Sequence, residues 1–172
     1  MAALWSMPAL LLVPGCNGGP NKPVAAADPA EQLEATATER GLVRAPDDLD
    51  PVGVYARGSD RLCIAATKAG ANEAASLRAG VIVDYGESHA CSANGTATRD
   101  GDRLSLTLGP NCRFEARIDG DVICFPGAVP AGCSSACTGR ASLSGLSVER
   151  ISDSGAEAVA LRDRGGRMLC SD

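Results

Sequence analysis

Aromatic side chains are scarce in this chain, and histidine is nearly absent. The 172 residues include one Trp, two Tyr, two Phe and one His. No run of about 18 apolar residues occurs, which excludes a protein that crosses a membrane several times with helices. The formal net charge of -5 disfavours a basic reader of nucleic acid, so we expect no nucleic-acid partner. Any catalysis through an imidazole would have to use His89.

An apolar, uncharged segment opens the chain. Residues 1–15 carry no charged side chain, and the run Leu10–Val13 suits the apolar centre of a secretory signal. The segment is too short to span a bilayer as a stable anchor. The sequence therefore predicts a signal peptide over residues 1–15 and export of the protein.

The end of this segment carries a family resemblance. The residues Leu12–Cys16, which read LVPGC, resemble the lipobox of bacterial lipoprotein precursors, although no Lys or Arg precedes the apolar run and Pro14 stands where a small or β-branched residue is usual. In that family the leader is cut before the cysteine, whose thiol forms a thioether to diacylglycerol. The resemblance implies lipidation of Cys16 and a membrane as partner.

The same resemblance implies a location in the cell envelope. Because Asn17 rather than Asp follows Cys16, the family's sorting rule implies an outer-membrane lipoprotein that faces the periplasm. An ordinary cleaved signal peptide is the alternative, and it would give a soluble periplasmic or secreted protein.

Residues 16–50 are predicted to form a flexible, lipid-attached tether. They begin with a stretch rich in Gly, Pro, Asn and Ala that offers almost nothing to bury. A short helix over about 29–40 is compatible with the capping residue Asp28 and with Pro29 at the first helical position. Gly41 would end that helix.

The globular domain is predicted over residues 51–172, and its sequence pattern indicates β structure. Short apolar runs, several of them alternating with polar residues, are separated by turn residues. Such runs indicate about seven strands among eight candidate segments. The candidate segments are 52–56, 62–66, 79–85, 96–99, 103–108, 113–118, 122–125 and 145–151.

One of the expected hairpins has a marked turn. Asp119-Gly120 is a favoured two-residue hairpin turn, because both positions tolerate positive φ. Pairing across it sets Phe114 opposite Phe125 on the apolar face, a contact that would fix the register.

A single helix is expected late in the chain. Ser154 and Glu157 form a capping-box pattern, and Gly165-Gly166 would end the helix, with a last short strand at 168–170. Together the elements predict a mainly β fold, namely a small antiparallel β-barrel or sandwich with one late α-helix.

Cysteine count adds disulfides to this fold. Seven cysteines follow Cys16, and in an exported protein most of them should be paired. A hairpin centred on 101–102 sets Ala97 opposite Leu106 and brings Cys91 near Cys112. Cys133 and Cys137 lie four residues apart and could pair locally. Cys63 with Cys170 follows by elimination. Each bridge would contribute about 2–5 kcal/mol. The candidate disulfides are Cys91–Cys112, Cys133–Cys137 and Cys63–Cys170, with Cys124 left unpaired.

The sequence assigns no catalytic residue, metal or cofactor. His89 and Cys91 have a spacing that metal ligands use, but the chain has no second histidine and Cys91 has a predicted disulfide partner. Residues 139–145 lack the Gly-x-Ser-x-Gly order of a serine nucleophile. Cys133 and Cys137 lack the redox spacing. We expect His89 to be a surface loop residue.

These observations favour a lipid-anchored cell-envelope protein that acts by binding or by structural support. The candidate partners are an envelope protein, a peptide or an envelope polymer. The chain looks like the broad class of small bacterial lipoproteins, some of which are β-barrel inhibitors of enzymes such as lysozyme. The alternatives are a small inhibitor of an envelope-targeting enzyme and a periplasmic enzyme, either a hydrolase or a thiol-redox protein that uses the odd cysteine.

Overall fold

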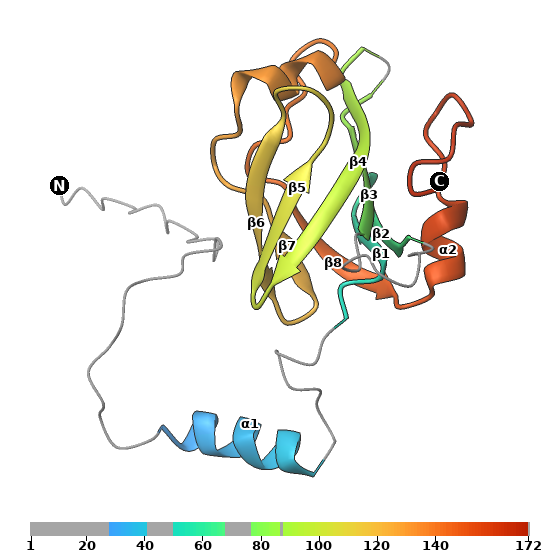
Figure 1. Cartoon of the computed structure of the whole chain (residues 1–172). Coiled ribbons are helices and arrows are strands. Elements are labelled where there is room, and N and C mark those ends of the chain that lie inside the picture. The colour runs from blue at the N-terminus through green and yellow to red at the C-terminus, as the bar shows by residue number, and fades with distance from the viewer. Residues whose placement is uncertain (1–27, 41–49, 68–76, 87, 172) are drawn as a thin grey trace, which may run out of the picture.

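A closed barrel of antiparallel strands forms the centre of the protein (Figure 1). The computed structural model describes residues 28–40, 50–67, 77–86 and 88–171. Among these residues each strand pairs with its neighbours in sequence, and β8 pairs with β1 to close the barrel. The strands are β1 (Gly53–Arg57), β2 (Asp60–Ala66), β3 (Leu77–Asp84), β4 (Ala90–Asp100), β5 (Arg103–Thr107), β6 (Arg113–Asp119), β7 (Val122–Cys124) and β8 (Ser147–Ser152).

Side chains from alternate strand positions fill the barrel. Leu104 and Leu106 of β5 point inward and are fully buried, and Phe114 and Ala116 of β6 are buried beside them. The residues between them are not buried, which is the period-two pattern that the sequence predicts. An eight-stranded barrel has an interior just wide enough for side chains. The fold class is therefore the predicted mainly β barrel, and its inside is a packed core.

The sequence predicts one of the two middle hairpins correctly. In the β4–β5 hairpin Ala97 lies opposite Leu106, as expected. In the β6–β7 hairpin Ile118 lies opposite Ile123, so the turn is Gly120-Asp121 and the predicted register is wrong by two residues. Gly120 has a φ of 58°, which suits a turn with glycine at its first central position. A shift of two residues keeps the same faces, so both phenylalanines remain inside with ring centroids 4.9 Å apart.

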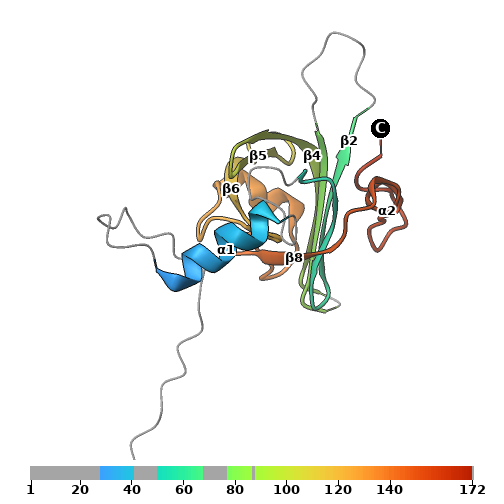
Figure 2. The same ribbon diagram turned by 90° about the horizontal axis from the view of Figure 1, so that it is seen from below.

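The helix α2 (Gly155–Ala160) and the C-terminal segment 161–171 lie outside the barrel (Figure 2). A second apolar cluster packs between them and the barrel wall. Ser154 accepts a hydrogen bond from the Glu157 N–H, as the capping pattern predicts. The helix ends at Ala160 rather than at the predicted glycine pair, because the chain turns extended there and folds back over β2. The buried members of the cluster are Val54, Cys63, Ala65, Ala158, Leu169 and Cys170.

The helix α1 (Pro29–Glu39) precedes the barrel in the chain. The Asp28 side chain accepts a hydrogen bond from the Ala30 N–H at 3.1 Å, and Pro29 occupies the first turn, as the sequence predicts. None of the residues of this helix is buried. Its stability therefore comes from its cap and its own backbone bonds and not from packing.

Arg150 of β8 holds the chain where it enters the barrel. Its guanidinium donates hydrogen bonds to the carbonyl oxygens of Val52 and Asp50, each at 2.9 Å. The same group lies 3.1 Å from the Asp121 carboxylate and 5.0 Å from the centroid of the Tyr55 ring. We call these contacts the entry latch, because they tie residues 50–52 to the end of the barrel at which β1 begins.

Loss of the latch arginine should destabilise the barrel strongly. We expect Arg150→Met to lower the free energy of unfolding by about 2–4 kcal/mol, because two charge-assisted hydrogen bonds are lost. Asp121→Asn is the matched control and should cost less than about 1 kcal/mol, because the Asp121 side chain is 61% exposed. Urea denaturation measures both, and an Arg150→Met variant as stable as the parent would contradict the latch.

The buried phenol of Tyr55 gives a spectroscopic prediction. Burial raises the pKa of Tyr55 to about 12, against a partial lowering by Arg150. In a Tyr85→Phe variant Tyr55 is the last tyrosine, and its absorbance near 295 nm should titrate about two units above the ordinary value of about 10. The pKa of Tyr55 is higher in the folded chain than in the unfolded chain. The contribution of this residue to the free energy of unfolding is therefore complete below pH 10 and is lost as the pH rises toward 12. A midpoint near 10 in the folded variant would show that the phenol is solvated.

Candidate functional site

One end of the barrel is covered by the connection between β7 and β8, residues 125–146, which we call the cap loop (Figure 1, orange). Its regular structure is a short 3-10 helix, η2 (Ala131–Ala136). Leu143 and Leu146 of the cap loop are buried in the barrel core. Connections longer than about 12–15 residues with little regular structure are usually functional or disordered. This end of the barrel, toward which the β1–β2, β3–β4 and β5–β6 turns also point, is therefore the candidate site.

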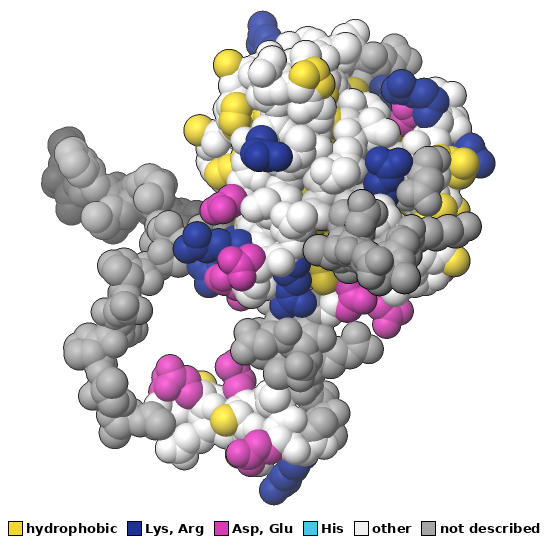
Figure 3. Space-filling model, in the orientation of Figure 1, with side chains coloured by type: hydrophobic (Ala, Val, Ile, Leu, Met, Phe, Trp, Pro, Cys, Tyr) yellow, Lys and Arg dark blue, Asp and Glu magenta, His cyan; other side chains and the backbone are white. Residues whose placement is uncertain are grey.

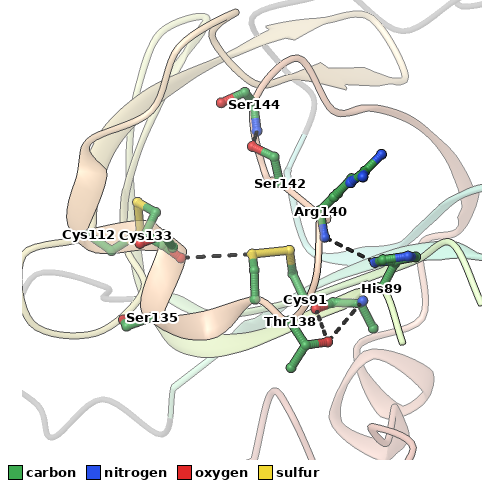
Figure 4. The surroundings of a disulfide bond; sticks show 12 residues. His89, Cys91, Cys112, Cys133, Ser135, Thr138, Arg140, Ser142 and Ser144 are labelled. Carbon is green, nitrogen blue, oxygen red and sulfur yellow. Dashed lines mark hydrogen bonds between the residues drawn. A yellow bond between two sulfur atoms is a disulfide. The ribbon is translucent and has the colours of Figure 1, made fainter. Parts of the chain in front are cut away.

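Two disulfides fix the cap loop to the barrel (Figure 4). Cys137 is bonded to Cys91 at the start of β4, and their Cα atoms are 3.9 Å apart. Cys133 is bonded to Cys112 beside the β5–β6 turn, and their Cα atoms are 4.6 Å apart. Next to the first bond, the Thr138 N–H donates to a β4 carbonyl at 2.7 Å. The loop is thus held at two of the turns that surround it.

These pairings correct the predicted Cys91–Cys112 and Cys133–Cys137 bonds. The symmetry of the β4–β5 hairpin does not extend to Cys112, because the chain turns back after Leu108, whose N–H donates to the Cys112 carbonyl at 2.8 Å. Cys112 therefore belongs to the β5–β6 hairpin and meets the cap loop. The 3-10 helix η2 ends at Ala136, and Cys137 follows it in an extended conformation, so the two cysteines do not share a helical turn. Cys133 and Cys137 consequently bond to different partners.

The remaining cysteines give one confirmed prediction and one correction. Cys63 and Cys170 are bonded, with a Cα separation of 6.2 Å, and this bond holds the C-terminal segment on β2. Cys124, predicted to be unpaired, is disulfide-bonded. The redox alternative therefore loses the thiol on which it depended. Cys16, the predicted lipidation site, also lies outside the described residues.

His89 is part of the support of the cap loop. Its Nδ1 accepts a hydrogen bond from the Arg140 N–H at 3.0 Å (Figure 4). Gly139 has a φ of 60°, and a Cβ at this position would collide with the imidazole. The histidine lies in the turn between β3 and β4, as expected of a surface loop residue, and it is half-buried and has a structural contact. Since Cys91 is in a disulfide, it offers no thiolate as a second metal ligand, and within the described ranges no three His, Cys, Asp or Glu residues gather as a metal site.

An open groove of about 400 Å³ runs beside the cap loop. We call it the turn groove, because the β1–β2 turn, the β3–β4 turn and the end of the cap loop line it. Tyr85 on its rim is 63% exposed, whereas the other described aromatic residues are buried. Asp60 is buried, and its carboxylate accepts a hydrogen bond from the Asp84 N–H at 3.0 Å. The lining includes Arg57, Ser59, Asp60, Tyr85, Ser144 and Ser147.

The charges of another hollow of about 400 Å³, outside β5–β7, are already paired. Arg103 lies 3.7 Å from Glu115, and Arg117 lies 3.8 Å from Asp102. Charges of both signs are also interspersed on the face of the molecule drawn in Figure 3. Arg57 of the turn groove differs, because it forms no hydrogen bond or ion pair with its side chain in the structure as described.

Sequence reasoning missed Arg57 and Tyr85. Both residues directly precede a turn glycine with positive φ, Gly58 and Gly86. A large side chain next to a tight turn is typical of a residue displayed at the end of a hairpin. That signal was present in the sequence, but only the barrel brings the two turns together.

The comparisons with known proteins found no relative of this chain. No protein-family model, no curated protein and no solved structure matches this chain. None of the helices in the described ranges is both long and apolar enough to cross a membrane. The interpretation of the capped end therefore depends on the chemistry of its own residues.

Removal of the cap-loop disulfides should loosen the loop selectively. In the double variant Cys91→Ala, Cys137→Ala we expect the amides of residues 126–146 to exchange with deuterium faster than in the parent, while the amides of β2 and β3 keep their protection. Each disulfide contributes about 3–5 kcal/mol in the chain-entropy model. Hydrogen-exchange mass spectrometry of the oxidised protein measures the difference.

The third disulfide supplies the matched control. Cys63→Ala with Cys170→Ala should speed exchange in residues 161–171 and leave the cap loop protected, because this bond holds the C-terminal segment alone. Equal loosening of the cap loop in both double variants would contradict the assignment.

Proposed function

We propose that this protein is a lipid-anchored module of the bacterial cell envelope, which binds an extracytoplasmic partner with the capped end of its barrel. The lipobox-like residues Leu12–Cys16 support the anchor. The disulfides Cys63–Cys170, Cys91–Cys137 and Cys112–Cys133 support an oxidising compartment, because such bonds persist outside the reducing cytoplasm.

The opposite placement of the chain entry and the cap loop carries this proposal. The entry latch holds residues 50–52 where β1 begins, and β1 then runs to the end at which the cap loop lies. A tether that joins the domain at the latch leaves the capped end free of the lipid. Loops on a rigid β scaffold are a common arrangement for binding sites.

The packed barrel interior supports binding at the surface. Apolar side chains fill the space in which larger barrels carry a ligand. A partner of this protein therefore contacts the loops, and the turn groove beside the cap loop is the hollow at that end with a free charge and an exposed aromatic ring.

The anchor is tested by mass spectrometry of the native protein from the membrane fraction. We expect the mature chain to begin at Cys16, with the mass of a diacylglycerol thioether on that residue. Cys16→Ser should move the protein to the soluble fraction, because acyl chains are what hold it on the membrane. Asn17→Ala, which keeps the thiol, is the control and should remain acylated.

Two results would contradict the anchor. One is a mature chain that begins after residue 16, and the other is a Cys16 peptide that is disulfide-linked and carries no acyl group. A sulfur atom in a thioether cannot also form a disulfide. In an acylated chain the bond of Cys124 would therefore have to reach a cysteine of another molecule, because the other six cysteines pair among themselves, and the same spectrum distinguishes these outcomes.

A further inference from the structure

We propose that the turn groove binds an acidic polysaccharide, in which pyranose rings carry carboxylate groups. The inference rests on the proposed function, since it names the class of partner for the capped end. Arg57, Tyr85 and the polar lining between them would make the contacts.

Arg57 supplies the charge that recognises an acid. Neighbouring arginines are engaged: Arg61 donates to the Gly58 and Asp60 carbonyl oxygens at 2.6 and 2.7 Å, and Arg164 pairs with Asp84. Arg57 is exposed and holds no such partner among the residues described. A guanidinium presents two parallel N–H donors that match a carboxylate, which makes the free Arg57 suited to a ligand with an acidic group.

Among the described residues, no acidic side chain near the groove forms an ion pair with Arg57. Arg164 holds the pKa of Asp84 below its ordinary value through a side-chain hydrogen bond, so Asp84 stays ionised and paired. Asp60 lies opposite Arg57 in the β1–β2 ladder, but its carboxylate is buried and accepts a hydrogen bond from the Asp84 N–H instead of pairing with the guanidinium. Arg57 therefore remains the charged group of the lining that is free for a ligand.

Tyr85 supplies a flat surface for a sugar ring. Its side chain is 63% exposed in a protein that otherwise buries its described aromatic residues. An aromatic face has a negative charge distribution, and the C–H groups on one side of a pyranose carry the complementary positive charge. An exposed tyrosine beside a free arginine thus offers the two contacts that a uronic acid ring needs.

The rest of the lining favours a sugar over a protein segment. Ser59 and Ser144 bring hydroxyl groups to the lining. The Ser59 hydroxyl donates to the Asp84 carbonyl and can still accept from a sugar hydroxyl, and the Ser144 hydroxyl accepts from the Val129 N–H and can still donate to one. Protein hot spots are also rich in Tyr and Arg, but they lie in well-packed pockets that are fully desolvated, whereas the turn groove is open. Leu146, the large aliphatic residue of the lining, is only 6% exposed and faces the core, so the groove offers little apolar surface for such a hot spot.

The size of the groove suits a short stretch of a polymer. Its volume of about 400 Å³ lies in the range of small-ligand sites. Because the groove is open, a longer chain can continue beyond the rings that are bound. A polysaccharide therefore fits the shape as well as the chemistry.

The test uses tetragalacturonate and the full-length protein labelled with ¹⁵N. In an NMR titration we expect saturable shifts of the amides in residues 57–60, 84–86 and 144–147. Arg57→Ala and Tyr85→Ala should each weaken binding at least about tenfold, while Tyr85→Phe should stay within about threefold, because the ring and not the hydroxyl makes the contact. Arg117→Ala, which removes an exposed arginine of β6, is the matched control and should bind as the parent does.

Two further probes separate the charge from the ring. Fully methyl-esterified tetragalacturonate has the same rings without the charge and should bind at least about tenfold more weakly. Hexaglutamate has the charge without the rings and should not saturate the site. Equal binding of hexaglutamate would overturn the proposal in favour of an acidic protein segment, and shifts confined to other surfaces, or none with tetragalacturonate, would overturn it outright.

The outcome separates this inference from the proposed function. Acylated Cys16 together with an unresponsive groove overturns the polysaccharide site and leaves the anchor standing. Saturable binding at the groove by a protein whose Cys16 carries no lipid supports the site and overturns the anchor.

Discussion

The bonds Cys91–Cys137 and Cys112–Cys133 determine where the cap loop lies, and the shape of one end of the barrel depends on them. The loop is long and presents mainly small and polar residues, so packing alone contributes little to its order. Leu143 and Leu146 are its buried aliphatic contacts. With the two covalent bonds in place, the last turn of the loop forms one wall of the turn groove, opposite the turns that present Arg57 and Tyr85.

The two ends of the barrel are stabilised by different kinds of interaction. At the entry end a partly buried guanidinium, Arg150, collects carbonyl oxygens, a carboxylate and an aromatic ring. At the capped end two disulfides and the hydrogen bond that His89 Nδ1 accepts from the Arg140 N–H hold the cap loop. The core between the ends contains few aromatic residues, so its apolar area comes mostly from Leu, Ile, Val and Ala. Such a core is modest in a domain of this size, and cross-links compensate for it.

The elements that follow from local periodicity were predictable from the sequence. Leu104 and Leu106 alternate with polar residues, and parity alone places them inside the barrel. The Ser154 cap and the β4–β5 register follow from local rules in the same way. The error at Gly120 shows the limit of local rules. Asp119-Gly120 and Gly120-Asp121 both suit a two-residue turn, and both registers place the same side chains inside the barrel.

The site depends on contacts between residues distant in sequence, and local rules do not reach them. The partner of Cys112 is set by a reversal of the chain after Leu108, and the partner of Cys137 by a loop that crosses the end of the barrel. Nothing local in the sequence distinguishes Arg57 and Tyr85 from other residues beside turns. The pairing of β1, β2 and β3 is what brings them to the same groove. The odd number of cysteines after residue 16 suggested a free thiol, but Cys124 is bonded.

The central claim is that disulfide bonds replace a large aromatic core as the source of stability. The most direct measurement is thermal unfolding of the full-length protein, oxidised and after complete reduction and alkylation. The three bridges between described cysteines, at about 2–5 kcal/mol each, equal most of the typical stability of a domain, about 5–15 kcal/mol. The account predicts that the reduced chain unfolds without a cooperative transition, or with a Tm at least about 15 °C lower. An unchanged Tm after reduction would contradict it.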